Sequence, residues 1–396
     1  MQPLFLTHTA VATSAGIGMD AAHQALVEMH SGLAPCTFEN AALDCYVGQI
    51  PDSLLAPVSG ALADFDCRNN RLAQLGLRQD GFEQAVLAAK EKYGAHRVGV
   101  FMGTSTSGIL ETENAYRRRG SDNELPADFR YATTHNTYSL AWFVQSYFGL
   151  NGPAIAVSTA CSSSAKTFGN AARMIAAGVC DAAVVGGVDS LCLTTLYGFS
   201  SLGLLSTARC RPFDSERDGI SIGEGAAMVL LEKQPAPGSN DTVALLGVGE
   251  SSDAYHMSSP HPDGLGARSA MELALRNADV KPKEIDYVNL HGTGTRSNDA
   301  AEDKAVCAVL GESVPCSSTK GWTGHTLGAC GSIEAVFCVL AITRGLMPGS
   351  VNTRELDPLM KLNYLRENRH APVRIAMSNS FGFGGTNCSL VVGRPR

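Results

Sequence analysis

Short apolar segments alternate with longer segments of helical periodicity along this chain of 396 residues. The run LFLTHTAVAT at residues 4–13 predicts a first strand, and residues 154–158 predict a buried strand further along. Apolar residues at helical spacing predict helices at 161–178, 267–278 and 331–345. Because strand-like and helical segments alternate, the pattern predicts an α/β fold in which helices cover a sheet.

Three segments of the first half resemble three segments of the second half. The pairs are 98–108 with 287–297, 155–164 with 314–324, and 222–232 with 381–393. Matching halves predict a pseudo-symmetric duplication with a functional site where they meet, and chance likeness of Gly- and Thr-rich segments is the alternative. A stretch with Pro, Gly, Ser and Asn at 232–242 interrupts the pattern, which divides the chain into 1–235 and 236–396.

The composition is that of a globular protein, with 44% hydrophobic and 17% charged residues. No run of 18 apolar residues predicts a membrane span, and no basic segment precedes the first apolar run as in a signal peptide. The net charge of −7 offers nucleic acid no general attraction. Twelve cysteines without a CxxC pair indicate reduced thiols and a cytoplasmic location.

One cysteine stands at an unusual place, the junction between a predicted strand and a predicted helix. Cys161 lies between Ala160 and Ser162, and the helical pattern follows at once. Free N–H groups at a helix N-terminus favour a thiolate and can stabilise an oxyanion, so the position suits a nucleophile. A buried structural cysteine is the alternative for this residue taken alone.

Two histidines and a lysine lie in Gly- and Thr-rich turns of the second half. His291 follows the strand-like run IDYVNL, and Lys320 and His325 lie in STKGWTGH. Cys161 with two histidines suits nucleophilic chemistry, but a zinc site and a Cys–His–acid hydrolase remain alternatives. In a hydrolase, Asp299 or Glu302 would orient a histidine.

Six blocks along the chain carry a family resemblance. They are STACSSS around Cys161, RPFDSERDGISIGEGAAMVLLEK (211–233), SSDAYHMSSPHPDG (251–264), HGTGTRSND (291–299), STKGWTGHTLGACG (318–331) and NSFGFGGTN (379–387). With these blocks in this order over nearly the whole length, the sequence resembles the elongating β-ketoacyl-[acyl carrier protein] synthases. The resemblance implies a thiolase-like five-layer αβαβα fold built from two pseudo-symmetric halves.

The resemblance also implies a division of labour among the catalytic residues. Cys161 would form the acyl-enzyme, and His291 and His325 would assist decarboxylation of malonyl-carrier protein as neutral N–H donors. Lys320 would pair with Glu334 and tune the local field. Initiating relatives carry Asn where His325 stands, which favours elongation.

Further residues are assigned to the substrate by the same resemblance. Thr293 and Thr295 would bind the phosphopantetheine arm, which arrives on the carrier protein, so that no bound cofactor or metal is expected. Phe383 would supply an oxyanion N–H and gate the site. Thr106 would lie at the floor of the acyl pocket, near the dimer partner, and Phe199 and Phe381 would also bind the substrate.

The partners implied are an acidic acyl carrier protein and a second chain, in a homodimer or in a heterodimer with a chain-length-factor-like protein. Arg68, Arg71, Arg130 and Arg209 fall in segments where the family docks its carrier. Arg296 and the Gly321-Trp322 pair depart from the usual fatty-acid pattern, which with Thr106 suggests aryl polyene or related polyketide elongation. A catalytically silent partner of a ketosynthase heterodimer is the alternative function.

Overall fold

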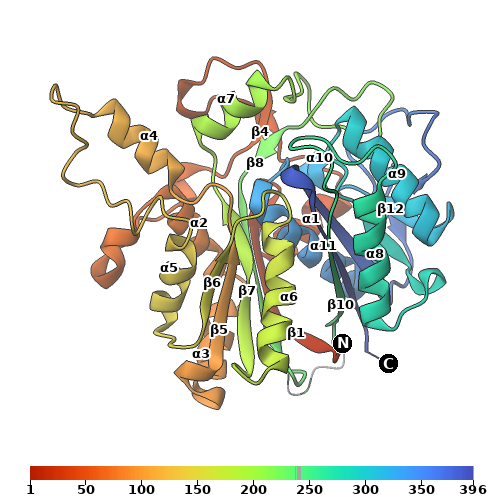
Figure 1. Cartoon of the computed structure of the whole chain (residues 1–396), viewed down its shortest axis with the longest axis horizontal. Coiled ribbons are helices and arrows are strands. Elements are labelled where there is room, and N and C mark those ends of the chain that lie inside the picture. The colour runs from red at the N-terminus through yellow and green to blue at the C-terminus, as the bar shows by residue number, and fades with distance from the viewer. Residues whose placement is uncertain (237, 239–241, 396) are drawn as a thin grey trace.

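The computed structural model describes residues 1–236, 238 and 242–395, and its backbone is organised around one sheet of twelve strands (Figure 1). These strands are β1 (Leu4–Thr13), β2 (Gly16–Ile17), β5 (Val98–Gly103), β6 (Ala154–Val157), β7 (Ala182–Asp189), β9 (Gly225–Glu232), β10 (Ala244–Ser252), β11 (Tyr287–Asn289), β12 (Pro315–Ser317), β14 (Asn363–Tyr364), β16 (Ile375–Gly382) and β17 (Thr386–Gly393). Residues 237 and 239–241 of the predicted joint lie outside the described residues.

Both halves of the sheet follow the same plan. In the first half the order is β1-β9-β7-β5-β6, and in the second half it is β10-β17-β16-β11-β12. In each half the first two pairings are antiparallel and the last two are parallel. The three similar segment pairs fall on β5 and β11, β6 and β12, and β9 and β17, as a duplication requires. β1 pairs with β10 and thereby joins the halves into one sheet.

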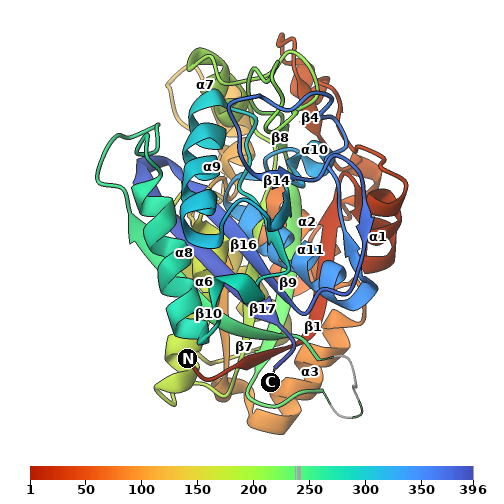
Figure 2. The same ribbon diagram turned by 90° about the vertical axis from the view of Figure 1, so that its right-hand side faces the viewer.

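Three layers of helices cover this sheet. Those with eight or more residues are α1 (Met19–Val27), α2 (Arg68–Leu77), α3 (Phe82–Tyr93), α4 (Ile109–Arg117), α5 (Ser139–Phe148), α6 (Ser163–Ala176), α7 (Leu193–Ser201), α8 (Leu265–Ala278), α9 (Arg296–Leu310) and α11 (Cys330–Arg344). The helices α2, α3 and α5 cover the outer face of the first half (Figure 1), and α8 and α9 cover that of the second (Figure 2). The helices α6 and α11 lie between the halves.

Alternating strand residues separate the layers. On β7, Ala182 and Val184 pack in the outer core, whereas Ala183 and Val185 pack against the central helices. This period of two is that of a strand buried on both faces. The result is the predicted five-layer αβαβα arrangement.

The central helix α11 is buried over almost its whole length. Within the described residues, the stretch Leu327–Arg344 is long and apolar enough to cross a membrane by length and composition, but 89% of it is buried inside the protein. Its apolar character is therefore that of a core helix.

Smaller elements complete the structure. They are β3 (Ala34–Pro35), β4 (Tyr46–Gly48), β8 (Ile222–Gly223), β13 (Leu346–Met347), β15 (Arg369–His370) and the short helix α10 (Lys320–Thr323).

Candidate active site

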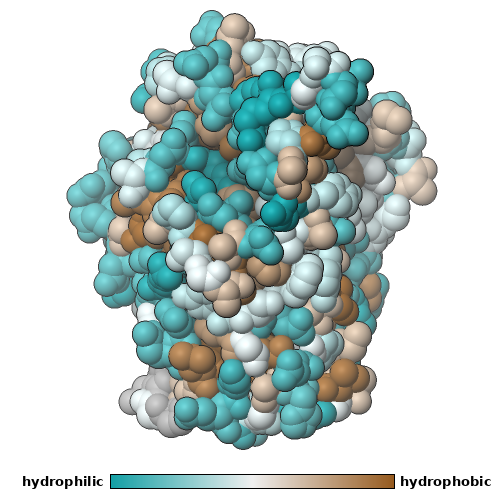
Figure 3. Space-filling view, turned by 90° about the vertical axis from the view of Figure 1, so that its left-hand side faces the viewer, coloured by the Kyte–Doolittle hydropathy of each residue, from teal (hydrophilic) through white to brown (hydrophobic). Residues whose placement is uncertain are grey.

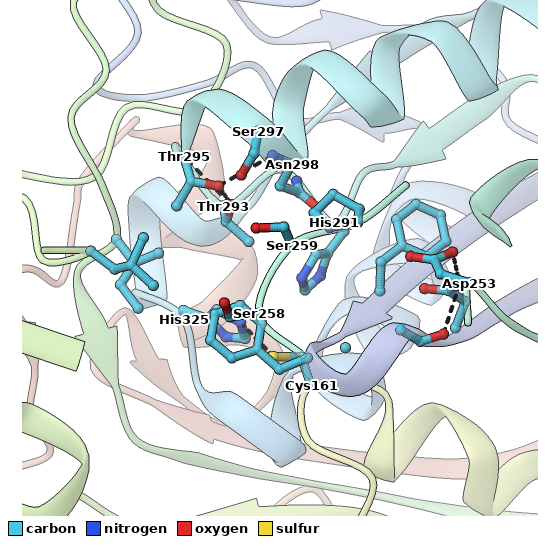
Figure 4. A pocket seen from close by; sticks show the side chains of 18 of the residues that line it. Cys161, Asp253, Ser258, Ser259, His291, Thr293, Thr295, Ser297, Asn298 and His325 are labelled. Carbon is cyan, nitrogen blue, oxygen red and sulfur yellow. Dashed lines mark hydrogen bonds between the residues drawn. The ribbon is translucent and has the colours of Figure 1, made fainter. Parts of the chain in front are cut away.

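The chemistry-bearing residues lie in loops that follow strands of both halves (Figure 4). Cys161 follows β6, and His291 follows β11. Lys320 and His325 follow β12, and Phe383 lies in the turn between β16 and β17. Reactive atoms of Cys161, His291 and His325 lie within 4.8 Å of one another. Folding thus brings one thiol of the first half and two imidazoles of the second together, where the matching halves predict a functional site.

A strained turn presents the Cys161 thiol. Ala160 has φ 51°, a left-handed conformation that is unfavourable for a residue with a Cβ. The helix α6 begins at Ser163 and is buried on the side that faces the core. Burial raises the pKa of the Cys161 thiol to about 11, while the Lys320 charge and the backbone N–H of Phe383 act in the opposite direction. The resting residue is therefore a thiol at neutral pH.

The ring of His325 is oriented by its own loop. Its Nε2 lies 3.1 Å from Sγ of Cys161, and its Nδ1 lies 3.1 Å from the backbone N–H of Leu327. Because that N–H can only donate, Nδ1 is the acceptor and Nε2 carries the proton. Burial, with a smaller contribution from the Lys320 charge, lowers the pKa of His325 well below 6.5. A neutral imidazole therefore points its N–H at the sulfur.

His291 has the same tautomer for a different reason. Its Nδ1 lies 3.4 Å from the ammonium of Lys320, which has no lone pair to offer. The proton of the neutral ring is consequently on Nε2. Burial, the Lys320 charge and His325 lower the pKa of His291 well below 6.5. The two imidazole rings meet edge to face, with centroids 5.3 Å apart.

Lys320 is 1% exposed and connects the histidines to the core. Its ammonium contacts the backbone oxygen of His291 and forms an ion pair with Glu334, so the predicted pairing is confirmed. Burial opposes the charge, but the Glu334 carboxylate holds the pKa of Lys320 above its usual value. Burial and, after it, this permanent positive charge beside His291 together keep that ring neutral.

The acidic residues of the hydrolase alternative lie elsewhere. Glu302 accepts hydrogen bonds from the backbone N–H groups of His291 and Gly292, each at 2.8 Å. Asp299 accepts from the backbone N–H of Phe213. Among the described residues neither carboxylate hydrogen-bonds an imidazole nitrogen, so the site lacks the acid of a Cys–His–acid triad.

The donor set also disfavours the zinc alternative. A histidine that binds a metal through Nε2 needs its proton on Nδ1, where it is usually donated to an acceptor. Here the Nδ1 of His325 faces an N–H and the Nδ1 of His291 faces an ammonium. The geometry therefore suits two N–H donors better than two metal ligands.

A cavity of about 590 Å³, including its open mouth, reaches these groups from the surface. The predicted substrate residues Thr293, Thr295, Phe199, Phe381 and Phe383 all line it. The hydroxyls of Thr293 and Thr295 lie 2.9 Å apart, and the rings of Phe199 and Phe383 are 5.7 Å apart.

Several further residues of this cavity have no role that the sequence predicts. They are Leu204, Ile220, Asp253, Ser258, Ser259, Pro260, Ser297, Asn298 and Asn387. Some belong to the block SSDAYHMSSPHPDG, which contributed to the family resemblance. Membership of that block was the only sequence signal that could have assigned them to the cavity. No residue within the block has an obvious chemical role.

Thr106 does not lie at the floor of the cavity in the single chain, where the sequence predicts it. It is 1% exposed and does not line the cavity. Its hydroxyl donates to Oδ1 of Asp189 at 2.8 Å. Within one chain the hydroxyl is therefore committed to a buried carboxylate and unavailable to a substrate.

The prediction that Arg68 docks the carrier protein is wrong. Its side chain is 10% exposed and forms ion pairs with Glu224 and Asp52. Two of its guanidinium nitrogens bind Glu224, which lies far away in sequence. The guanidinium neutralises the buried Glu224 carboxylate, because an unpaired charge in the interior is costly.

The other three arginines are at least partly exposed. Arg71 pairs with Asp66 at 2.6 Å, and Arg130 lies 3.5 Å from Asp64. Arg209 donates to the backbone oxygen of Leu33 and lies over the ring of Tyr46. Their docking role stays a prediction.

Family models match both halves of the chain. The model for the N-terminal domain of β-ketoacyl synthase matches residues 71–236, and that for the C-terminal domain matches residues 243–354.

Curated relatives match this chain along most of their own length. The chain is 36% identical over 361 residues to 3-oxoacyl-[acyl-carrier-protein] synthase 2 of Vibrio harveyi, covering 84% of this chain and 86% of the relative. It is 35% identical over 319 residues to nodulation protein E of Rhizobium meliloti, covering 78% and 79%. A solved ketosynthase from Xenorhabdus doucetiae, in complex with its chain length factor, superposes with a TM-score of 0.90 at 38% identity, covering 100% and 98%.

Proposed function

The chain belongs to the β-ketoacyl-[acyl carrier protein] synthases of the thiolase superfamily, which are acyltransferases, and we propose that Cys161, His291 and His325 perform its condensation reaction. The reaction joins an acyl thioester to a malonyl thioester and releases CO2. The residue roles rest on the geometry of the site, and they divide the reaction into three steps.

In the first step, sulfur of Cys161 attacks the carbonyl carbon of the acyl-carrier thioester. A new C–S bond forms, the bond to the carrier sulfur breaks, and the carrier thiol leaves with the proton that Cys161 gives up. The backbone N–H groups of Cys161 and Phe383 both point toward Sγ and stabilise negative charge on it. They are therefore well placed for the oxyanion that forms next to it.

In the second step, malonyl-carrier protein loses CO2. The electron pair of the broken C–C bond becomes an enolate whose negative charge gathers on the thioester oxygen. The two Nε2–H groups of His291 and His325 donate to that oxygen. Neutral donors suit this role, because they are already protonated and oriented before charge develops.

In the third step, the enolate carbon attacks the acyl-Cys161 carbonyl. A C–C bond forms, the C–S bond breaks, and the released Cys161 sulfur takes up one proton. The products are a β-ketoacyl thioester on the carrier, a free carrier thiol and CO2. The single observation that carries this mechanism is the Nε2–Sγ distance of 3.1 Å between residues of different halves.

The test uses acyl-carrier and malonyl-carrier protein with intact-mass detection. We expect a Cys161 adduct equal to the acyl group when acyl-carrier protein is supplied alone, and a β-ketoacyl-carrier product when malonyl-carrier protein is added. Thioester hydrolysis without any need for malonyl-carrier protein would contradict the proposal and favour a hydrolase. A folded protein that forms no adduct would favour the silent partner, a function that the intact Cys161 and histidine set disfavours.

We also propose that a second ketosynthase-like chain pairs with the exposed edge of β6. This strand ends the sheet, and its outer edge has no strand partner among residues 1–236, 238 and 242–395. Tyr138 at the start of α5 and Trp142 within it are 40% and 39% exposed, and apolar side chains are also present on this face (Figure 3). An unpaired edge and exposed aromatics are typical of an interface.

The similarity to a ketosynthase solved with its chain length factor supports a heterodimer over a homodimer. Mixing the chain with a homologous protein that lacks the nucleophile, followed by size-exclusion chromatography with light scattering, tests this choice. A 1:1 complex is expected. A homodimer that remains unchanged by the added homologue would contradict it.

For the pathway, we propose specialised aryl polyene or polyketide elongation. The departures from the usual fatty-acid pattern at Arg296 and Trp322 support this proposal. Thr106 does not support it, because its hydroxyl is bound to Asp189. Chain-extension assays that compare saturated with polyunsaturated or aryl acyl-carrier substrates decide the matter. Equal or better use of saturated chains would reject the specialised pathway. The carrier-borne phosphopantetheine, the absence of a bound cofactor and the cytoplasmic location stay predictions.

A further inference from the structure

A buried carboxylate outside the reacting groups contacts the loop that holds His325. Asp189 ends β7 in the first half and is fully buried. Its Oδ1 accepts hydrogen bonds from Thr104, Ser105 and Thr106, at 2.7–2.8 Å. Its Oδ2 accepts one hydrogen bond, from the backbone N–H of Gly328 at 2.5 Å. The carboxylate thus ties a first-half loop to a second-half turn.

That turn is strained and adjoins the catalytic imidazole. Leu327 has φ 51°, which leucine rarely adopts. Its backbone N–H is the donor that fixes Nδ1 of His325 as an acceptor. An unfavourable backbone conformation persists only where neighbouring contacts hold it. The hydrogen bond from the next residue, Gly328, to Asp189 is such a contact.

We propose that Asp189 is a positioning residue for His325, holding the turn at 326–328 so that the Leu327 N–H keeps the proton of His325 on Nε2. The inference rests on the proposed function, in which that Nε2–H stabilises the enolate. Asp189 acts through the turn and touches no reacting atom. Other contacts hold the rest of His325, because its backbone N–H donates to the oxygen of Ser221. The effect of Asp189 is therefore confined to the ring and its tautomer.

Asp189→Asn separates the two sides of the carboxylate. An amide has one oxygen, and the Thr104–Thr106 loop offers four donors to it, whereas Gly328 offers one. The oxygen therefore stays with the loop, and the NH2 group faces the Gly328 N–H, where two donors repel. We expect the turn to relax and His325 to lose its fixed tautomer.

The experiment compares the two half-reactions. For Asp189→Asn we expect malonyl-carrier decarboxylation to fall about tenfold or more, while acylation of Cys161 changes less than about threefold. Thr104→Val is the matched control, because it removes a donor to Oδ1 and leaves the Gly328 contact intact. It should change neither half-reaction by more than about threefold. Equal losses of both half-reactions in Asp189→Asn, or the same pattern in the control, would overturn the proposal.

A second variant approaches the same contact from the other side. A Cβ at Gly328 would lie 2.8 Å from Oδ2 of Asp189 and 2.6 Å from Oγ of Ser105. Gly328→Ala should therefore reproduce the selective loss of decarboxylation, with Asp189 unchanged. Full decarboxylation activity in a folded Gly328→Ala protein would contradict the role of this contact.

The wild-type protein provides a readout that needs no variant to fold. With 15N-labelled histidine, NMR should show His325 as a neutral ring protonated on Nε2 at pH 7. A ring protonated on Nδ1 would overturn the proposal outright. A wild-type protein that has this tautomer but no condensation activity would instead reject the proposed function, so the two failures are distinguishable.

Discussion

The two halves of the molecule share a strand order but differ in the connection that follows the equivalent strands β6 and β12. In the first half, residues 158–162 lead directly into α6, so Cys161 lies immediately before the helix. In the second half, residues 318–329 separate β12 from α11, and this longer connection contains Lys320 and His325. The duplication thus places two equivalent strand ends at one site. The short connection positions a thiol there, whereas the longer one positions a lysine and a histidine.

A second contrast concerns the G-T-x-T turns after β5 and β11. In each half a buried carboxylate holds the turn, Asp189 in the first and Glu302 in the second. In the first half the threonine hydroxyls also bind the carboxylate, whereas Thr293 and Thr295 face the cavity. The same local sequence therefore serves as support in one half and as a substrate surface in the other.

The largest effect is expected from removing the contribution of the first half. Cys161→Ala should lower condensation by at least about 10³-fold, because no other group at the site can form the acyl thioester. Intact mass should show no acyl adduct. Cys330→Ala is the matched control, since this buried thiol donates to the backbone oxygen of Cys161 but lines no part of the cavity. An undiminished adduct in Cys161→Ala would place the nucleophile elsewhere.

Removing a donor from the second half should damage only one half-reaction. His325→Ala deletes an Nε2–H that the enolate needs, so decarboxylation should fall about 10²- to 10⁴-fold while Cys161 still becomes acylated. Separate measurement of released CO2 and of the acyl adduct tests this division. Loss of acylation to the same extent would mean that the imidazole acts mainly as the base for the thiol.

The buried ion pair of the second half sets the next largest effect. Glu334→Gln leaves the Lys320 ammonium buried without its carboxylate, which should lower the free energy of unfolding by about 3–5 kcal/mol. Denaturant titration measures the change. Glu250→Gln, which removes the partly exposed carboxylate that pairs with Arg173 and Lys166, should cost no more than about 1 kcal/mol. Equal costs for the two variants would show that the buried pair is not structurally demanding.

The smallest expected effect is that of pH on the decarboxylation rate, which should be nearly constant between pH 7 and pH 6. A base whose folded-state pKa is lowered stays neutral until the pH falls below that lowered value, and both imidazoles have pKa values well below 6.5. The decarboxylation rate should therefore change less than about 1.5-fold between pH 7 and pH 6. A decline with a midpoint near 6.5 would indicate an imidazole with an ordinary pKa.

Much of the fold could be predicted because its signals are local. The first strand at 4–13 and the helices near 161–178, 267–278 and 331–345 agree with β1, α6, α8 and α11 to within two residues. Apolar periodicity determines which face of an element is buried, and this information lies within each segment. The paired segments likewise predicted a duplication, and the two halves have the same strand order.

Arg68 and Thr106 show where local signals end. The sequence around Arg68 resembles a docking segment, but its guanidinium forms a buried ion pair with Glu224, which lies between β8 and β9. Thr106 resembles a pocket residue, but Asp189 from β7 binds its hydroxyl. Whether a polar side chain is free or committed depends on partners far away in sequence, and no local pattern contains them.

The sequence by itself determined the family, the layered architecture and the candidate groups Cys161, His291, His325 and Lys320, because motifs and periodicity are properties of short segments. The tertiary structure alone decided which nitrogen of each histidine carries the proton. Tautomers follow from the groups that face Nδ1, here a backbone N–H and a buried ammonium. The contact of His291 with Lys320 joins residues of two different loops, and both contacts exist only in the folded chain, since a hydrogen bond requires two groups within about 3 Å.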